Sequence, residues 1–205
     1  VVKANAYGHG DIQVAEAAIE AGVTMLAVAT PDEAVHMRHH FEQIDILVLG
    51  ASPISFVPYA AHHNITLTVF SAQWVEQAAE SQKVLPNPVK LHIKIDSGMG
   101  RIGVTSSEQL LQLSNTIQAT SLFVVDGIFT HFATADDEDS AHFDKQAQLF
   151  EMLLRELPEK PRLVHVANTA PALVKNASLQ YDAVRFGISM YGLLPSSYVG
   201  QILPF

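Results

Sequence analysis

The sequence contains no cysteine, which excludes disulfide bonds, thiol nucleophiles and zinc–thiolate sites. It also lacks an apolar run of the roughly 20 residues that a membrane-spanning helix needs. Positive charge is scarce, because 12 Lys and Arg stand against 21 Asp and Glu. The resulting net charge of −9 argues against a nucleic-acid partner. No histidine pair has metal-ligand spacing such as His-Glu-x-x-His, so the sequence predicts no metal site.

What the chain does have is enough apolar sequence for one full-sized domain. Of its 205 residues, 48% are hydrophobic and 16% are charged, a balance that excludes a disordered chain. The composition predicts a soluble, cytoplasmic protein with no membrane partner. The sequence opens on Val1-Val2-Lys3 with no signal peptide and stops at Pro204-Phe205 without a tail. We therefore expect residues to be missing upstream and further residues to be missing at the other end.

Short apolar runs alternate with amphipathic stretches along nearly the whole chain. Helices are predicted at residues 11–21, 71–81, 106–115 and 139–157, with a further helix start at Thr30-Pro31. With the truncated run before Lys3, about eight strands are predicted, the others at residues 25–29, 44–49, 65–69, 89–95, 122–129, 163–167 and 183–186. This alternation predicts an α/β fold, a (β/α)8 TIM-type barrel truncated at its first strand. An open doubly wound sheet is the alternative, weakened by the absence of a Gly-x-Gly-x-x-Gly turn near the start.

The first polar cluster is KANAYGHG at residues 3–10, directly after an apolar strand end. The carboxyl ends of barrel strands carry the reactive groups, so Lys3 would point into a desolvated mouth. Desolvation favours the neutral amine that attacks a carbonyl. An ordinary surface lysine at a strand end explains the position equally well at this stage.

The second cluster follows the strand predicted at residues 89–95. Alternation sends His92, Lys94 and Asp96 to one face, the barrel interior, where a charged Lys94 is costly unless it is paired or chemically modified. Arg101 lies in a glycine-rich stretch and offers a forked donor suited to a carboxylate. The alternative for Arg101 is a surface ion pair.

The third cluster lies at the ends of the late strands and contains His131, His165, Asn168, Thr169 and Arg185. Asn168 and Thr169 stand where a strand passes into a short helix, so a hydroxyl and backbone N–H groups there can hold an anion. Phosphate sites after the seventh and eighth strands recur in this type of barrel. A single strand-end histidine is commonly structural, but two histidines and an arginine on successive strand ends favour a functional site.

The motif at residues 1–10 resembles the pyridoxal-phosphate attachment motif of alanine racemase. Residues 94–103, 130–136, 165–170 and 184–192 match further blocks of that family in the same order. The resemblance implies an N-terminal barrel, here residues 1–192, followed at residues 193–205 by the start of a connection to a C-terminal β domain. It also implies pyridoxal 5'-phosphate as the cofactor, alanine as the substrate and a homodimer.

The resemblance assigns catalytic roles to three residues. Lys3 would be the Schiff-base lysine and would move the substrate's Cα proton on one face. Arg101 would help to hold the substrate carboxylate and the cofactor's phenolic oxygen, and His131 would belong to the surrounding hydrogen-bond network. Lys94 matches a position that is carbamylated in some members of the family.

The remaining matching residues would bind the cofactor. Arg185 would face the pyridine nitrogen and leave it unprotonated, because an arginine does not readily give up its proton. His165 would join the hydrogen-bond network, and Asn168 lies beside the phosphate site. The phosphate would be contacted through hydroxyl or backbone groups of Tyr7, Thr169, Gly187 and Ile188. Thr169 stands where many members have serine, and the hydroxyl is kept.

The family needs a second base on the opposite face, a tyrosine from the C-terminal domain of the partner subunit, and no residue here matches it. The chain alone is therefore predicted to bind the cofactor and to racemise alanine poorly. Two other readings remain. One is a non-catalytic barrel that binds pyridoxal phosphate for cofactor homeostasis. The other is a related fold type III amino-acid racemase or decarboxylase.

Overall fold

A computed structural model gives the structure of the chain and describes residues 1–174 and 179–203. The chain forms two compact units, unit 1 (Val1–His92 and Asn115–Val125) and unit 2 (Ile93–Ser114 and Asp126–Phe205). Strands β4 (Val89–Lys94) and β5 (Phe123–Phe129) and helix α6 (Ser107–Gln118) contribute residues to both units. The division therefore runs through secondary-structure elements and does not follow a linker.

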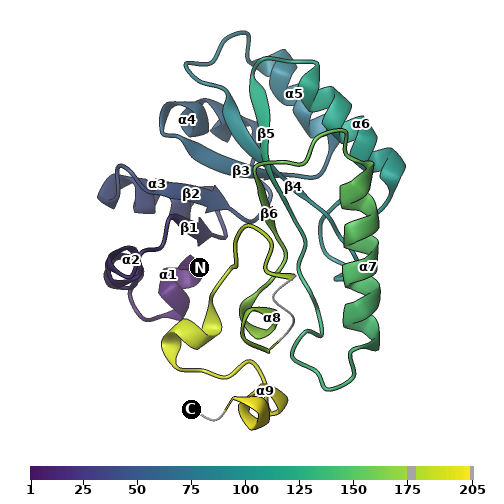
Figure 1. Cartoon of the computed structure of the whole chain (residues 1–205). Helices are drawn as coiled ribbons and strands as arrows, with labels where there is room; N and C mark the ends of the chain where they lie inside the picture. Colours follow the sequence, from purple (N-terminus) through teal and green to yellow (C-terminus); the bar gives the residue numbers. More distant parts are fainter. Residues whose placement is uncertain (175–178, 204–205) are drawn as a thin grey trace. The chain divides into compact units, whose positions relative to one another are not determined.

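Unit 1 is built on the parallel strands β1 (Met25–Val28), β2 (Asp45–Val48) and β3 (Ile65–Val69), which neighbour one another in that order and continue to β4. Figure 1 shows α3 beside β2 and α4 beside β3. Its complete helices are α1 (Lys3–Tyr7), α2 (Asp11–Glu20), α3 (Pro31–His40), α4 (Val57–His62, after the 3-10 turn η1, Ile54–Phe56) and α5 (Ala72–Ser81).

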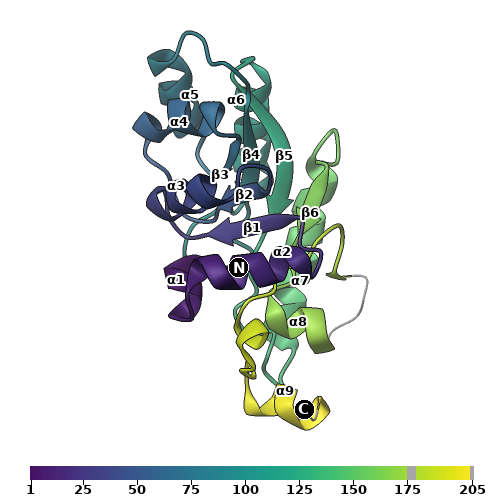
Figure 2. The ribbon, with the colours of Figure 1, turned by 90° about the vertical axis from the view of Figure 1, so that its left-hand side faces the viewer.

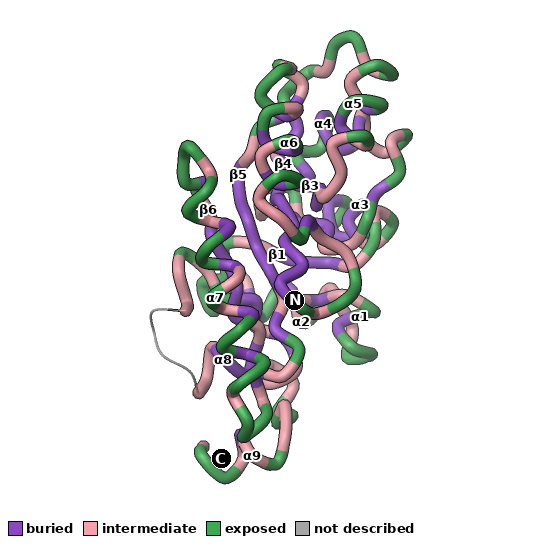
Figure 3. Tube along the Cα trace, turned by 90° about the vertical axis from the view of Figure 1, so that its right-hand side faces the viewer, coloured by how far each residue is buried: buried purple, intermediate pink, exposed green. Residues whose placement is uncertain are grey.

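Local sequence signals explain where the helices of unit 1 begin. Thr30 caps α3 by accepting a hydrogen bond from the N–H of Glu33, and Pro31 occupies the first helical position. Ser71 caps α5 in the same way by accepting from the N–H of Trp74. Every residue of β3 is buried, including the polar Thr66 and Thr68, as is typical of a parallel strand covered on both faces, and Figure 3 shows the buried course of the strands.

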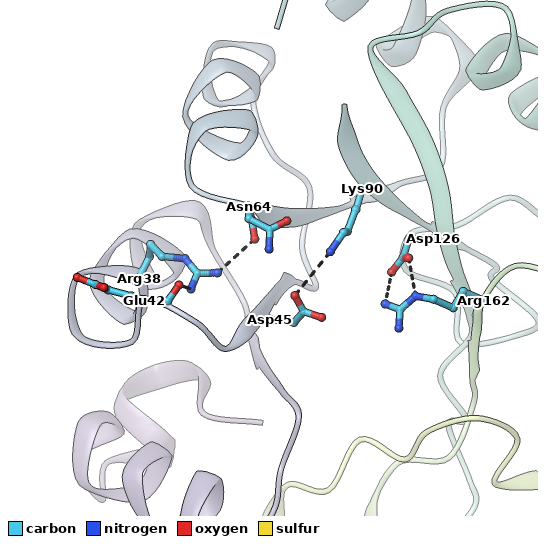
Figure 4. Close-up of polar contacts among 7 residues, drawn as sticks. All are labelled: Arg38, Glu42, Asp45, Asn64, Lys90, Asp126 and Arg162. Atoms are coloured by element: carbon cyan, nitrogen blue, oxygen red, sulfur yellow. Dashed lines mark hydrogen bonds and ion pairs between the residues drawn. The ribbon is translucent and has the colours of Figure 1, made fainter. Parts of the chain in front are cut away.

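Two buried or half-buried cations tie elements of unit 1 together (Figure 4). Arg38, at the end of α3, is 7% exposed and donates to the backbone carbonyls of Phe41, Glu42 and Asn64. Lys90 on β4 pairs with Asp45 on β2 at 3.7 Å. The Lys90–Asp45 pair thus links β4 to β2, and Arg38 links the end of α3 to the residue that precedes β3.

Unit 2 contains the ends of β4 and β5, strand β6 (Leu163–His165), and the helices α7 (Ala141–Glu156), α8 (Thr169–Val174), η3 (Ile188–Tyr191) and α9 (Ser197–Ile202). β5 and β6 pair in parallel from Gly127↔Leu163 to Phe129↔His165. Phe132 packs edge-on against Phe143 of α7 with ring centroids 4.7 Å apart. Beside these strands, Arg162 donates two 2.8 Å hydrogen bonds to Asp126 (Figure 4).

The parallel α/β fold predicted from the sequence is present, but the strand count differs from the predicted eight. Six strands are assigned among residues 1–174 and 179–203. The strand predicted at residues 183–186 is not formed. That segment runs beside the β6 region, where Val164 accepts from the N–H of Asp182 and Ala167 from that of Arg185. The residue before Lys3 is likewise outside any assigned strand, although Val2 donates to the Ala27 carbonyl at 2.9 Å.

Within the described ranges, no helix combines the length and the apolar character that a membrane crossing requires.

Candidate active site

The residues singled out from the sequence fall in both units. Lys3 and Tyr7 lie in unit 1, and the other candidates, Lys94, Arg101, His131, His165, Asn168, Thr169, Arg185, Gly187 and Ile188, lie in unit 2.

The backbone that follows Lys3 is a left-handed turn made of residues with side chains. Ala4, Asn5 and Ala6 have φ of 51–53° and ψ of 47–51°, and Tyr7 has φ 55°. Left-handed helical conformation costs an L-residue about 1–2 kcal/mol, so four residues store about 4–8 kcal/mol. This left-handed conformation was not predicted from the sequence.

Several hydrogen bonds hold this turn in its left-handed conformation. The Ala6 N–H donates to the Val2 carbonyl at 2.9 Å, and the Gly8 N–H donates to the carbonyls of Ala4 and Asn5. The side chain of Asn5 accepts from the Asp11 N–H at 3.0 Å, which joins the turn to the first residue of α2. Figure 2 shows α1 beside β1 and α2. Backbone strain of this kind persists only where the surroundings enforce it, and it concentrates at functional sites.

Lys3 is half-buried and its Nζ lies 5.8 Å from the centroid of the Tyr7 ring. Tyr7 is 40% exposed, and desolvation by burial raises the pKa of its hydroxyl above the usual value of 10.0. The hydroxyl therefore keeps its proton at neutral pH and can donate a hydrogen bond to an anion.

Arg185 is the centre of the polar network in unit 2. It is 9% exposed, and its NH1 donates to His165 twice, to Nδ1 at 2.9 Å and to the carbonyl at 2.7 Å. Its NH2 donates to the carbonyls of Thr130 and Val166 and lies 3.4 Å from Nδ1 of His131. Acceptors from the ends of β5 and β6 thus hold one guanidinium. Since Nδ1 of His165 accepts, the ring proton of a neutral His165 lies on Nε2.

Two cations flank the ring of Phe129 in unit 2. Lys94 Nζ lies 5.0 Å and Arg185 Cζ 5.3 Å from its centroid, while His165 stacks on it at 4.8 Å. Lys94 is 5% exposed and donates to the Ile95 carbonyl at 3.0 Å. Burial, then repulsion by Arg185, lowers the pKa of Lys94 to about 7, and Arg101 adds to this while Asp96 opposes it. A substantial fraction of Lys94 is therefore a neutral amine at physiological pH.

The loop that carries Arg101 is organised by one carboxylate. Asp96 accepts from the backbone N–H groups of residues 98–101 at 2.8–3.1 Å. Burial acts to raise the pKa of Asp96, but these four hydrogen bonds outweigh it and hold the pKa below its usual value. Gly103 has φ 143°, and a Cβ there would lie 2.2 Å from the Asp96 nitrogen, so only glycine fits. Arg101 itself is exposed.

The remaining candidates gather where β6 leads into α8. Thr169 is the first residue of α8, and its Oγ1 accepts from the Gly187 N–H at 3.0 Å. Because that oxygen accepts from Gly187, its own hydrogen remains available as a donor. Gly187 directly precedes η3, which begins at Ile188. Asn168 donates to the Phe132 carbonyl at 3.3 Å and lies 3.4 Å from Nε2 of His131.

Two residues that bond to the backbone beside the candidates were not singled out from the sequence. Gln146 of α7 is fully buried, accepts from the Ala133 N–H at 2.9 Å and donates to the His131 carbonyl at 3.3 Å. Glu33 accepts from the Ala4 N–H at 2.7 Å, immediately after Lys3. The signal for Gln146 is a glutamine on the apolar stripe of α7, whereas Glu33 stands in the first turn of α3 and has the pattern of an ordinary helix cap.

The donor set fits pyridoxal phosphate. In unit 1, the amine of Lys3 is of the kind that bonds to an aldehyde, and the hydroxyl of Tyr7 can donate to a phosphate. In unit 2, taken by itself, the hydroxyl of Thr169 can donate to a phosphate, and the guanidinium of Arg185 can donate to an unprotonated ring nitrogen. A parallel α/β fold that carries donors of these kinds is typical of one class of protein, the barrel-like enzymes that use this cofactor.

Comparison with known proteins identifies the family within that class. Residues 1–195 match the family described as alanine racemase, N-terminal domain, and the chain belongs to it. The predicted fold class is thereby confirmed as the barrel-like α/β fold of that domain. The family consists of pyridoxal-phosphate-dependent isomerases.

Curated relatives and solved structures agree with this assignment. The chain is 47% identical to alanine racemases of Anoxybacillus flavithermus and Geobacillus kaustophilus, covering 100% of this chain and 53% of each relative. It matches the crystal structure of Bacillus anthracis alanine racemase with a TM-score of 0.92 and 41% identity, over 100% of this chain and 53% of that one. The chain thus spans about half the length of the relatives it matches.

One structural neighbour carries a different name. A histidine racemase from Leuconostoc mesenteroides has a TM-score of 0.91 and 33% identity, with 100% of this chain and 55% of that chain covered.

Proposed function

We propose that this chain supplies the cofactor-binding barrel of an alanine racemase, which interconverts L-alanine and D-alanine with pyridoxal 5'-phosphate. The observation that carries the proposal is the similarity to alanine racemases along the whole chain, from the Lys3 motif to Ile188. The product D-alanine would serve peptidoglycan synthesis in the cytoplasm. The cofactor, when bound, supplies an electron sink that makes the substrate's Cα proton removable.

Lys3 would bind the aldehyde of the cofactor and would move the Cα proton on one face of the substrate. The left-handed turn after Lys3 would fix the direction in which its side chain leaves the backbone, and this would explain why the strained conformation is kept. Tyr7, Thr169, Gly187 and Ile188 would hold the phosphate through hydroxyl and backbone N–H groups, with Asn168 beside them. These donors are all uncharged, so they would hold the phosphate by hydrogen bonds alone and not by ion pairs.

Arg185 would face the ring nitrogen and keep it unprotonated. Burial, then repulsion by Arg101, lowers the pKa of Arg185 to about 9, so the guanidinium stays charged at neutral pH. A charged guanidinium at that position would not transfer its proton to the ring nitrogen, so the electron sink would be weaker and side reactions would be disfavoured. His131 and His165 hold Arg185 in place through the contacts described above.

Arg101 would hold the substrate carboxylate, and we propose that Lys94 is carbamylated. The neutral Nζ attacks the carbon of carbon dioxide and one proton is released, which leaves an anion in place of a cation. Lys94 with its pKa near 7 provides that neutral amine. The repulsion from Arg185 and Arg101 would then become attraction, and the anion would orient Arg101.

The second base would be a tyrosine from the C-terminal domain of a partner subunit in a homodimer. Residues 1–192 would form the barrel and residues 193–205 the start of the connection to that domain, with residues 204–205 outside the described part of the chain. No residue of this chain matches that tyrosine, so the chain alone would bind the cofactor and turn alanine over poorly.

A substrate panel with chiral detection tests the proposal. The full-length homodimer is given single enantiomers of alanine and histidine, because one structural neighbour is a histidine racemase. The proposal expects racemisation of alanine, lost in Lys3→Ala. Preference for histidine would support a broader racemase, and cofactor binding without any turnover would support the non-catalytic cofactor-homeostasis reading. Release of carbon dioxide would indicate a decarboxylase.

A further inference from the structure

The strained turn after Lys3 is held by a carboxylate from a distant part of unit 1. Glu33, in the first turn of α3, accepts from the Ala4 N–H at 2.7 Å through Oε1. Ala4 is the residue directly after Lys3 and the first of the left-handed series. Through Oε2 the same carboxylate accepts from the N–H groups of Ala29 at 2.6 Å and Thr30 at 3.3 Å.

These contacts go beyond what a helix cap needs. The Glu33 carboxylate accepts from the Thr30 N–H, and the Thr30 hydroxyl accepts from the Glu33 N–H, so these two bonds form the reciprocal cap of α3. The contact with Ala4 spans 29 residues and adds nothing to α3. Instead, it joins the backbone at Lys3 to the end of β1, a rigid element, through a charge-assisted hydrogen bond.

The hydrogen bond from Ala4 to Glu33 matters because Ala4 is in a left-handed conformation. Alanine disfavours φ of 52°, so without an external hold the backbone there would move towards right-handed values. Such a change would redirect the Cα–Cβ vector of the neighbouring Lys3. A glycine at position 4 would not have this bias, because glycine populates positive φ about as readily as negative φ.

We propose that Glu33 is a positioning residue for Lys3: its carboxylate locks the left-handed turn and thereby aims the amine that bonds to the cofactor. This inference rests on the proposed function, because it assigns Lys3 the role of cofactor lysine. Glu33 acts through the backbone of Ala4 and does not itself touch the cofactor.

The test compares Glu33→Ala with Thr30→Ala in the chain with pyridoxal phosphate. Both substitutions remove half of the reciprocal cap, but only Glu33→Ala removes the hold on Ala4. The rate of covalent attachment to Lys3 is followed by absorbance, and amide hydrogen exchange of Ala4 reports the local backbone. Glu33→Ala is expected to slow attachment and speed exchange at least about tenfold, as expected for the loss of one charge-assisted hydrogen bond. Thr30→Ala is expected to stay within about twofold.

A rescue variant separates positioning from general instability. In Glu33→Ala/Ala4→Gly, attachment is expected to recover towards the native rate, because glycine no longer resists the turn. Should Glu33→Ala fail to fold, Glu33→Gln is compared with Glu33→Gln/Ala4→Gly in the same assays. Equal losses in Thr30→Ala and Glu33→Ala, or no recovery with glycine, would overturn the inference. If the native chain itself forms no adduct on Lys3, the proposed function fails and the inference fails with it, whereas a native adduct with unchanged exchange of Ala4 in Glu33→Ala would overturn the inference alone.

Discussion

The buried side chain of Lys94 leads to a quantitative prediction about the stability of the fold. Its ammonium lies among buried groups beside two arginines, and its pKa falls from 10.5 in an exposed lysine to about 7. Since one pKa unit corresponds to about 1.4 kcal/mol, the charged form costs the fold up to about 5 kcal/mol below neutral pH. Replacing Lys94 by methionine, a neutral side chain of similar length, should remove this cost.

The sign of the pH dependence follows from proton binding. Between the folded pKa near 7 and the unfolded value of 10.5, the unfolded chain holds more protons, so stability rises with pH. Between about pH 7 and about pH 9 the free energy of unfolding should rise by about 2 kcal/mol because of Lys94. This gain should be absent from Lys94→Met.

Chemical denaturation at a series of pH values, in bicarbonate-free buffer, measures the effect. The difference between the wild-type and Lys94→Met curves of unfolding free energy against pH gives the contribution of Lys94. Lys145→Met serves as control, because Lys145 is exposed on α7. Adding bicarbonate at neutral pH should stabilise the wild type but not Lys94→Met, since carbamylation removes the positive charge. Parallel pH curves for the wild type and Lys94→Met would refute the reasoning.

Three further substitutions test the scaffold around the candidate site, each by the free energy of unfolding. Gly103→Ala should destabilise unit 2 by about 3 kcal/mol, since its Cβ would meet the Asp96 nitrogen at 2.2 Å, and a loss below about 1 kcal/mol would contradict the loop geometry. Gln146→Leu should cost about 2 kcal/mol by leaving two backbone groups near His131 without their partner, and an unchanged value would disprove that anchoring role. Asp126→Asn should cost about 1 kcal/mol, more than breaking the exposed Glu151–Arg155 pair with Glu151→Gln, and the reverse order would count against the bidentate pair.

Local signals explain which elements were predictable. The Thr30 cap with Pro31 marked the start of α3, and the apolar periodicity of residues 139–157 marked α7, because both signals depend on neighbours within one or two turns. The short run of β-branched and apolar residues at 65–69 likewise identified β3. The sequence therefore predicted the fold class and most element positions.

Long-range contacts explain what was missed. Arg185 has its acceptors at the ends of β5 and β6, and no local pattern encodes that convergence. Residues 183–186, which include Arg185, were predicted as a strand. The segment pairs with the β6 region only at separated points and forms no regular ladder. The left-handed turn escaped prediction because alanine and tyrosine carry no signal for positive φ, and its hold by Glu33 lies 29 residues away. The roles of Lys3 and the other cofactor contacts stay predictions.

The central claim is that Lys3 is the amine that bonds to the cofactor, and covalent trapping tests it most directly. The chain is incubated with pyridoxal phosphate, reduced with borohydride and digested, and the adduct is located by mass spectrometry. The account predicts an adduct on the peptide that contains Lys3 and its loss in Lys3→Ala. An unmodified Lys3 with the adduct on Lys94 or on a surface lysine would contradict it.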